Sequence, residues 1–146
     1  MAIKKFGITT INDIRLLEQR YNVILPNDYI EFLLHCNGGD VEFEDKFGVY
    51  VKYLKDNIHV DVLLGINTGN KDLDIDTWTD DYQCDMNEGM LIIGHSYEHG
   101  FIILNCSNNN QCVSYWDHAH EFECSDDESN NYFIADTFTE FVKSII

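Results

Sequence analysis

Residues 14–39 read IRLLEQRYNVILPNDYIEFLLHCNGG, and this pattern predicts the structure of the N-terminal part of the chain. Two apolar repeats of helical period lie on either side of a single proline. The first repeat predicts a helix over residues 11–21, which Thr10 can cap and in which Asp13 occupies the third position, close to a capping box. Its apolar stripe consists of Ile11, Ile14, Leu17 and Tyr21, and the residues off the stripe are Arg15, Glu18 and Arg20.

The second repeat predicts another helix that begins near the proline. Pro26 and the residue before it resist continuation of the first helix, and proline suits the first turn of a new one. Asn37-Gly38-Gly39 predicts the end of this helix, because glycine tolerates the left-handed conformation that follows many helices. The apolar face between these limits consists of Tyr29, Phe32, Leu33 and Cys36.

Strand patterns follow the two helices. Residues 47–54 alternate between apolar and polar side chains, which is typical of a half-buried strand. Further strands are predicted at 58–64, 90–93, 101–104 and 112–116, and alternation within 112–122 allows one or two strands there. Residues 72–82 fit a short irregular helix and 125–131 a polar, acidic loop. A last helix is expected after its cap, Asp136, with an apolar face of Phe138, Phe141 and Ile145.

The order of these elements predicts an α+β fold. Helices are segregated from strands and the connections between strands are short, which favours a largely antiparallel sheet over a doubly wound one. We expect two N-terminal helices and one C-terminal helix to flank this sheet. The 146 residues fit a single domain, residues 1–146, whose core requires neither a disulfide nor a metal.

The compartment is predicted from what the chain lacks. No run approaches the roughly 18 apolar residues of a membrane span, and residues 1–7 lack the apolar core of a signal peptide. We therefore expect a cytoplasmic protein whose five cysteines are free thiols. A disulfide between Cys106 and Cys112, which flank a polar turn, is the alternative.

The acidic residues are unevenly distributed along the chain. The net charge is −17 at pH 7. Residues 1–71 hold ten acidic and eight basic residues, whereas residues 72–146 hold sixteen acidic residues and one basic residue, Lys143. Such a surface repels nucleic acid and anionic membranes and attracts basic proteins. Solubility alone is the simpler interpretation, but solubility needs no asymmetry, so the pattern favours a basic protein partner.

The stretch quoted above also resembles a family signature. Its pattern IxxLExxYxxxLPxDYxxFLxxxNGG is similar to the N-terminal signature of the SUKH superfamily, which includes the Smi/Knr cell-wall-assembly regulators. Later segments resemble the central strand pair, a following Val-x-x-Trp-Asp strand and the closing helix of that superfamily: they are residues 93–94, 100–104, 113–118 and 135–141. The resemblance therefore covers nearly the whole chain.

The resemblance implies both a fold and a role. The implied fold is an α+β domain with a mixed, largely antiparallel sheet flanked by helices. Bacterial members are mostly immunity proteins that bind and block a toxin domain, often a nuclease, whereas fungal members regulate cell-wall synthesis. A nuclease toxin must be basic to hold nucleic acid, so an acidic inhibitor matches it. We expect an immunity protein, monomeric or weakly dimeric; the alternative is a regulatory or scaffold domain of the Smi/Knr type.

Two acidic stretches are the expected partner surface. Residues 72–88 place Trp78 and Tyr82 among seven acidic residues, and protein interfaces favour aromatic anchors in polar surroundings. Packing of Trp78 beneath this segment is the alternative interpretation, and Trp116 is expected to line the core or the sheet. The candidate partner-binding residues are Asp72, Asp74, Asp76, Trp78, Asp80, Asp81, Tyr82, Asp85, Asp117, Glu121, Glu123, Asp126 and Asp127.

The acidic run from Asp72 resembles the start of a calcium loop without completing it. Thr77 stands where that loop requires glycine, and Gln83 stands where it requires glutamate. We therefore interpret the run as a solvated acidic segment.

Zinc binding and cysteine catalysis are also incomplete as motifs. The histidines and the cysteine that could bind zinc have no standard spacing: they are His95, His99, His118, His120 and Cys124. His35 and Cys36 are neighbours on a predicted helix, where adjacent side chains do not face each other. We expect no catalytic residue, no metal and no cofactor.

Overall fold

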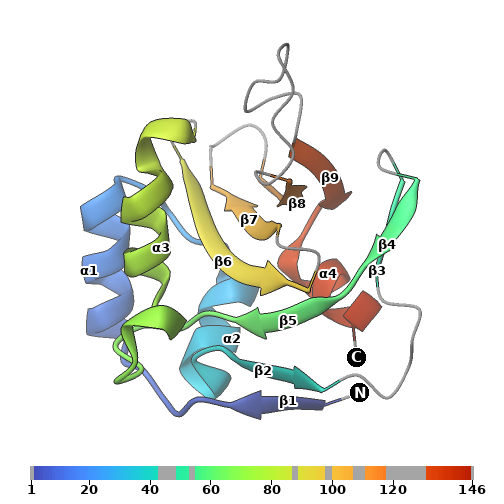
Figure 1. Ribbon diagram of the computed structural model, residues 1–146. Coiled ribbons are helices and arrows are strands. Elements are labelled where there is room, and N and C mark those ends of the chain that lie inside the picture. The colour runs from blue at the N-terminus through green and yellow to red at the C-terminus, as the bar shows by residue number, and fades with distance from the viewer. Residues whose placement is uncertain are drawn as a thin grey trace.

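The structure is a computed structural model that describes residues 2–42, 49–52, 55–86, 89–97, 100–106, 111–117 and 131–145 (Figure 1). Its elements are, in chain order, β1 (Ala2–Lys5), α1 (Ile11–Tyr21), α2 (Asn27–Cys36), β2 (Gly39–Glu42), β3 (Val49–Val51), β4 (Asp56–Ile58), β5 (Val60–Leu63), η1 (Lys71–Leu73), α3 (Ile75–Tyr82), η2 (Gln83–Asp85), β6 (Met90–Ser96), β7 (Phe101–Asn105), β8 (Cys112–Trp116), β9 (Asn131–Ala135) and α4 (Phe138–Ile145).

A seven-stranded sheet forms the centre of the molecule. Its strand order is β1-β2-β5-β6-β7-β8-β9, and each neighbouring pair is antiparallel. β3 and β4 pair separately as an antiparallel two-stranded sheet. The register shifts between Val60 and Val62 in the β5–β6 pair and between Ile92 and Gly94 in the β6–β7 pair, so each of these pairs contains a bulge. The predicted α+β class with a largely antiparallel sheet is confirmed.

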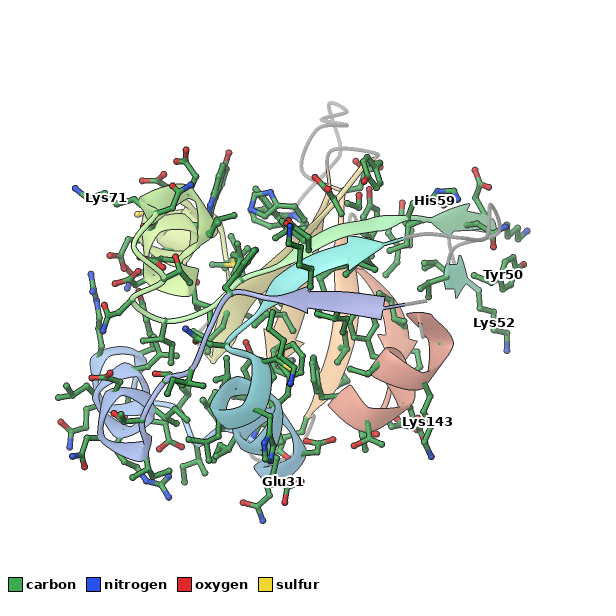
Figure 2. All side chains as sticks on the ribbon, turned by 90° about the horizontal axis from the view of Figure 1, so that it is seen from below. Glu31, Tyr50, Lys52, His59, Lys71 and Lys143 are labelled. Carbon is green, nitrogen blue, oxygen red and sulfur yellow. The ribbon has the colours of Figure 1, made fainter. Side chains whose placement is uncertain are left out.

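Helices cover both faces of this sheet, and more of them lie on one face than on the other. Figure 2 shows α1, α2 and α4 on one side and α3 on the other. The larger helical layer is held by aromatic packing: the Tyr29 ring of α2 lies 4.8 Å from that of Phe138 in α4, and both side chains are buried. None of the helices within the described ranges is long and apolar enough to cross a membrane.

The first two helices follow the predicted pattern with two corrections in α1. Thr10 caps α1 by accepting a hydrogen bond from the Asp13 amide at 3.2 Å. Ile11, expected on the apolar stripe, is 43% exposed. Glu18, expected off it, is buried because its Oε2 accepts a hydrogen bond from the Leu25 amide at 2.8 Å. The carboxylate thus bonds a backbone group that the turn after α1 would otherwise leave unpaired.

The Asn-Gly-Gly sequence after α2 ends the helix as predicted and also makes a tertiary contact. Asn37 adopts the left-handed conformation with φ of 49°. Its side-chain amide donates to the Ile66 carbonyl at 2.9 Å and accepts from the Ile66 amide at 2.8 Å. A Cβ atom on Gly65 would lie 2.1 Å from the Asn37 carbonyl oxygen, so glycine permits this close approach.

Several strand and cap predictions need correction. β1, β2 and β9 were not predicted, and the predicted strand 58–64 is two strands, β4 and β5, which belong to different sheets. Thr137, not Asp136, caps α4, because its Oγ1 accepts a hydrogen bond from the Glu140 amide at 3.1 Å. Pro26 lies one residue before α2 instead of within its first turn. Residues 118–122 and 125–130, for which strand and loop were predicted, lie outside the described part of the chain.

Candidate functional site

Helix α3, which carries much of the first acidic stretch, is fixed to α1 by polar contacts. Arg20 Nη1 lies 3.2 Å from Asp76 Oδ2, and Arg20 Nη2 pairs with Asp80 Oδ2. The Tyr21 hydroxyl donates to Asp80 Oδ1 at 2.7 Å. Partial burial and the bond to Asp80 hold the pKa of Tyr21 well above its usual range, so this hydroxyl remains a donor. These contacts set the position of α3 over the sheet.

The segment that leads into α3 is tied to the sheet by short contacts. Asp74 Oδ1 accepts hydrogen bonds from the Thr68 amide at 2.9 Å and from the Thr68 hydroxyl at 2.6 Å. Gly65 donates to the Leu73 carbonyl and accepts from the Ile75 amide, each at 2.9 Å. Since Asn37 holds the adjoining Ile66, the family-like Asn-Gly-Gly stretch positions α3 through this loop.

One row of side chains crosses the sheet on the side where α3 lies. Asp40, Val62, His95, Phe101 and Trp116 are directly opposite one another on successive strands, from β2 to β8. Residues opposite each other in an antiparallel pair project from the same face. The row therefore joins a carboxylate at one end of this face to an aromatic cluster at the other.

Two aromatic side chains of α3 pack onto that row. The ring centroid of Trp78 lies 4.3 Å from that of His95 and 5.7 Å from that of Phe101. The ring of Tyr82 lies 4.9 Å from that of Phe101 and 5.8 Å from that of Trp116. Trp78 and Tyr82 remain half-buried, whereas Phe101 and Trp116 are buried. The helix thus forms one wall of a surface whose floor is the sheet.

An open groove of about 380 Å³ lies between this helix and the sheet. Its lining residues are Asp61, Val62, Asp72, Trp78, Tyr82, His95, Ser96 and Phe101. Asp72 enters from η1 and Asp61 from the bulge of β5, so two carboxylates meet an aromatic wall. The groove combines a flat apolar surface with negative charge.

The potential beside the groove is negative. Tyr97, which follows β6, has its pKa raised above the ordinary value of 10.0, first by the charge of Asp61. Desolvation, a hydrogen bond to Asp61 and the charge of Asp40 act in the same direction. An anion is therefore disfavoured here and a cation favoured.

The predicted interface residues of the first stretch divide into two groups. Asp74, Asp76 and Asp80 are engaged within the protein through the contacts given above. Asp72, Trp78 and Tyr82 line the groove, and Asp81 is exposed on α3. The backbone of Asp85 lies in η2. Trp78 therefore packs on the sheet, as the alternative interpretation expected, and also lines an open surface.

The second acidic stretch is largely outside the described residues. Asp117 directly follows Trp116 at the end of β8 and is half-buried. The structure does not describe Glu121, Glu123, Asp126 and Asp127. Of this stretch, the structure thus places Asp117 alone, beside the aromatic row.

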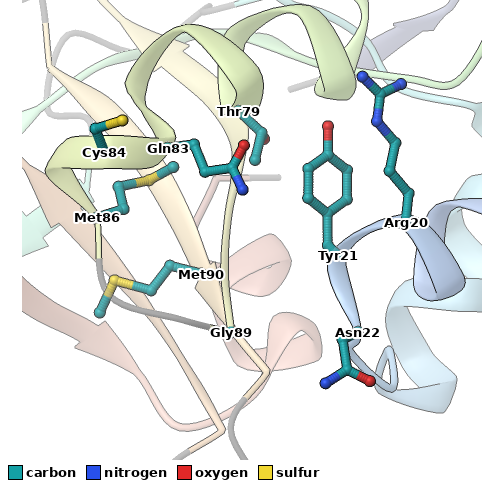
Figure 3. A pocket seen from close by; sticks show the side chains of 9 residues that line it. All are labelled: Arg20, Tyr21, Asn22, Thr79, Gln83, Cys84, Met86, Gly89 and Met90. Atoms are coloured by element: carbon teal, nitrogen blue, oxygen red, sulfur yellow. The ribbon is translucent and has the colours of Figure 1, made fainter.

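A second pocket of about 660 Å³ lies between the end of α1 and the segment from α3 to β6 (Figure 3). Arg20, Tyr21 and Thr79 contribute to its walls together with Cys84 and Met90. Arg20 is the only charged side chain among the described residues of the lining, and it pairs with Asp80 of α3. The described part of this lining therefore offers no carboxylate to a basic partner.

The part of the chain that the structure describes shows neither a disulfide nor a group of metal ligands. Cys36, Cys84, Cys106 and Cys112 are free thiols, so the alternative of a Cys106–Cys112 disulfide is wrong. Within the described ranges no three His, Cys, Asp or Glu side chains are grouped to hold a metal ion. His99, His118, His120 and Cys124 lie outside those ranges.

The sequence did not indicate five of the eight described residues that line the groove. The sequence indicates Phe101 only as part of a buried strand and His95 only as part of an incomplete set of zinc ligands, and it indicates no role for Asp61. Alternation along β5 and β6 could have assigned these residues to a face of the sheet. The pairing register and the α3 contacts that join them are not local sequence features.

Comparison with known proteins agrees with this architecture. The family model described as SMI1 / KNR4 family (SUKH-1) matches residues 8–144, which is almost the entire chain. No curated protein matches the sequence. The matched span runs from before α1 into the last turn of α4 and includes the Asn-Gly-Gly stretch, α3 and the aromatic row. The chain therefore belongs to the SMI1/KNR4 family, SUKH-1.

Proposed function

We propose that this protein is an immunity protein. It binds a cognate, basic toxin domain in the cytoplasm and covers the active surface of that toxin by stoichiometric contact, without catalysis. The observation that carries the proposal is the acidic, aromatic face formed by α3 and the sheet row beneath it. Family membership supports a protein-binding role, and the charge and geometry of this face support a basic partner.

The construction of this face suits tight protein binding. Trp78 and Tyr82 are held by ring contacts on the sheet, and α3 is held to α1 by Arg20. Anchors that are already ordered lose little conformational entropy on association. Aromatic anchors within a polar rim are also the side chains that contribute most to binding energy in protein interfaces.

The carboxylates that remain available lie around these anchors. Asp72 and Asp81 are exposed, and neither carboxylate pairs with a lysine or arginine of the described chain. The net charge of −17 adds long-range attraction for a basic protein and accelerates encounter. Nucleic acid and anionic membranes are disfavoured as partners for the same reason.

Co-expression with the protein encoded beside it tests this proposal. We expect the neighbouring gene product to be toxic alone, and this protein to restore growth and to co-purify with it in a fixed ratio. A harmless neighbour that does not bind would contradict the immunity role and favour a regulatory domain of the Smi/Knr type.

Two charge-reversal variants with the same net charge test which surface binds the toxin. Asp81→Lys on α3 should weaken capture of the toxin by about tenfold or more, because it reverses a charge beside the anchors. Glu31→Lys makes the same change in net charge on α2, on the opposite side of the sheet (Figure 2). If the two variants lose the same amount of toxin binding, the face around α3 is not part of the interface.

A further inference from the structure

The groove between α3 and the sheet has features that a general acidic surface does not need. Trp78 and Tyr82 form one wall, His95 and Phe101 form the floor, and Asp61 and Asp72 provide carboxylates from two separate elements. The volume of about 380 Å³ suits a single side chain better than a helix or a strand. The groove is therefore a pocket within the proposed interface that combines aromatic rings with two carboxylates.

Neither carboxylate of the groove forms an ion pair with a lysine or arginine of the described chain. Arg15 and Arg20 pair with residues of α1 and α3 outside the groove, and neither Asp61 nor Asp72 has an ion pair with a described lysine or arginine. Lys4 lies opposite Asp40, three strands away from His95, and makes no ion pair with either groove carboxylate. Tyr97 lies at the Asp61 end, where the charge of Asp61 raises the pKa of its hydroxyl.

The combination of aromatic rings and carboxylates selects one cation among those a protein can offer. A guanidinium group is planar, weakly hydrated and able to stack on an aromatic ring while its edge donates to carboxylates. A lysine ammonium is a compact, strongly hydrated charge that gains less from the flat wall. An apolar side chain would leave both carboxylates desolvated without a partner.

We propose that this groove receives one arginine side chain of the partner protein as the anchor of the complex. The guanidinium stacks against Trp78 and Tyr82, and its N–H groups donate to Asp61 and Asp72. This inference rests on the proposed function for the identity of the partner, but the groove itself can be tested without any toxin.

The test uses a small probe, N-acetyl-arginine methylamide, added to the full-length protein at low and constant ionic strength. The readout is the indole N–H resonance of Trp78, whose Nε1 donates to the Asp72 carbonyl at 2.8 Å beside the groove. Trp116→Phe assigns the resonance, since the chain has two tryptophans. We expect a saturable shift with a dissociation constant of roughly millimolar, the weak end of specific binding.

Three comparisons make this test specific. The neutral citrulline analogue should bind about tenfold more weakly or worse, and the lysine analogue should also bind more weakly. Asp61→Asn and Asp72→Asn should each weaken the arginine probe several-fold, while Glu31→Gln on α2, which removes the same charge, should leave it unchanged. Equal binding of the citrulline or lysine analogue, or equal behaviour of the three variants, would overturn the proposal.

Failure of this inference can be told apart from failure of the proposed function. If the probe does not bind while the neighbouring toxin is still captured, the arginine anchor is wrong and the immunity role remains. If the probe binds as expected while no toxin is captured, the groove remains and the immunity role is wrong. A Trp78 resonance that shifts with protein concentration before any probe is added would assign the groove to a second copy of the chain and overturn the proposal.

Discussion

Among single residues, Asn37 joins the end of α2 to the loop that leads to α3. It combines a left-handed backbone with two side-chain hydrogen bonds to Ile66. Both atoms of the amide are used and the side chain is buried, so no other residue type can fill both roles. The position thus couples the N-terminal helices to the candidate binding face.

Two variants separate the backbone and side-chain roles of Asn37. Asn37→Gly keeps the left-handed conformation but leaves both Ile66 groups unpaired, so we expect it to lower the free energy of unfolding by about 1–3 kcal/mol. Asn37→Ala should cost about 1 kcal/mol more, because alanine resists a positive φ. Urea unfolding of both variants measures the difference. Equal stability of the two would mean that φ of 49° imposes no cost on alanine here.

Cys106 provides a second test at this scale. Burial, followed by the charge of Glu18, raises the pKa of its thiol to about 12. At pH 8 only about one molecule in ten thousand would carry the reactive thiolate. We therefore expect iodoacetamide to modify the exposed Cys84 in the folded protein and Cys106 only after denaturation, as mapped by mass spectrometry. Modification of Cys106 at the rate of Cys84 in the native state would contradict its burial.

At the scale of elements, α3 shows that the acidic residues of one helix have different roles. Asp80 accepts hydrogen bonds from Arg20 and Tyr21, whereas Asp81 is exposed beside it. A reversal of charge at both positions would therefore mix a change in binding with a change in folding.

Single reversals on α3 should separate these effects. Asp80→Lys places a lysine beside Arg20, so we expect it to lower the free energy of unfolding by about 1 kcal/mol, the upper range for exposed pairs. Asp81→Lys should change stability by less than about 0.5 kcal/mol, because no described contact is lost. Thermal unfolding of the two variants at the same pH decides between them. If Asp81→Lys lowered the free energy of unfolding more than Asp80→Lys, the contacts of Arg20 would not be what stabilises the position of α3.

The elements that the sequence predicts are those with local signals. α1 has a side-chain cap at Thr10, and both α1 and α2 have an apolar period and end at an asparagine in the left-handed conformation. β1 was not predicted because it is a four-residue edge strand that includes Lys4 and Lys5, and lysine is typical of edges. Trp78 and Tyr82 could be predicted from their acidic surroundings, but Asp61 and Phe101 join them only through strand register and helix packing.

For the molecule as a whole, the acidic charge has opposite effects on folding and on binding. Residues 72–146 hold sixteen acidic residues and one basic residue, so folding brings like charges together. That repulsion destabilises the folded state, while the same field attracts a basic partner. Dissolved salt screens both interactions between exposed charges, over a distance of about 10 Å at 0.1 M.

A titration with sodium chloride should therefore move stability and affinity in opposite directions. Between about 20 mM and about 0.5 M salt, screening should raise the midpoint of thermal unfolding by several degrees, since about 1 kcal/mol corresponds to about 2–4 °C in a chain of this length. Over the same range the association rate with a basic toxin should fall by about tenfold or more. Asp81→Lys should reduce both slopes. Glu31→Lys should reduce the slope of stability to a similar extent and the slope of the association rate less, because both variants make the net charge less negative but only Asp81 lies on the proposed interface. A midpoint that falls as salt is added would show that attractive ion pairs outweigh the repulsion among the carboxylates, and would contradict this account of the charge.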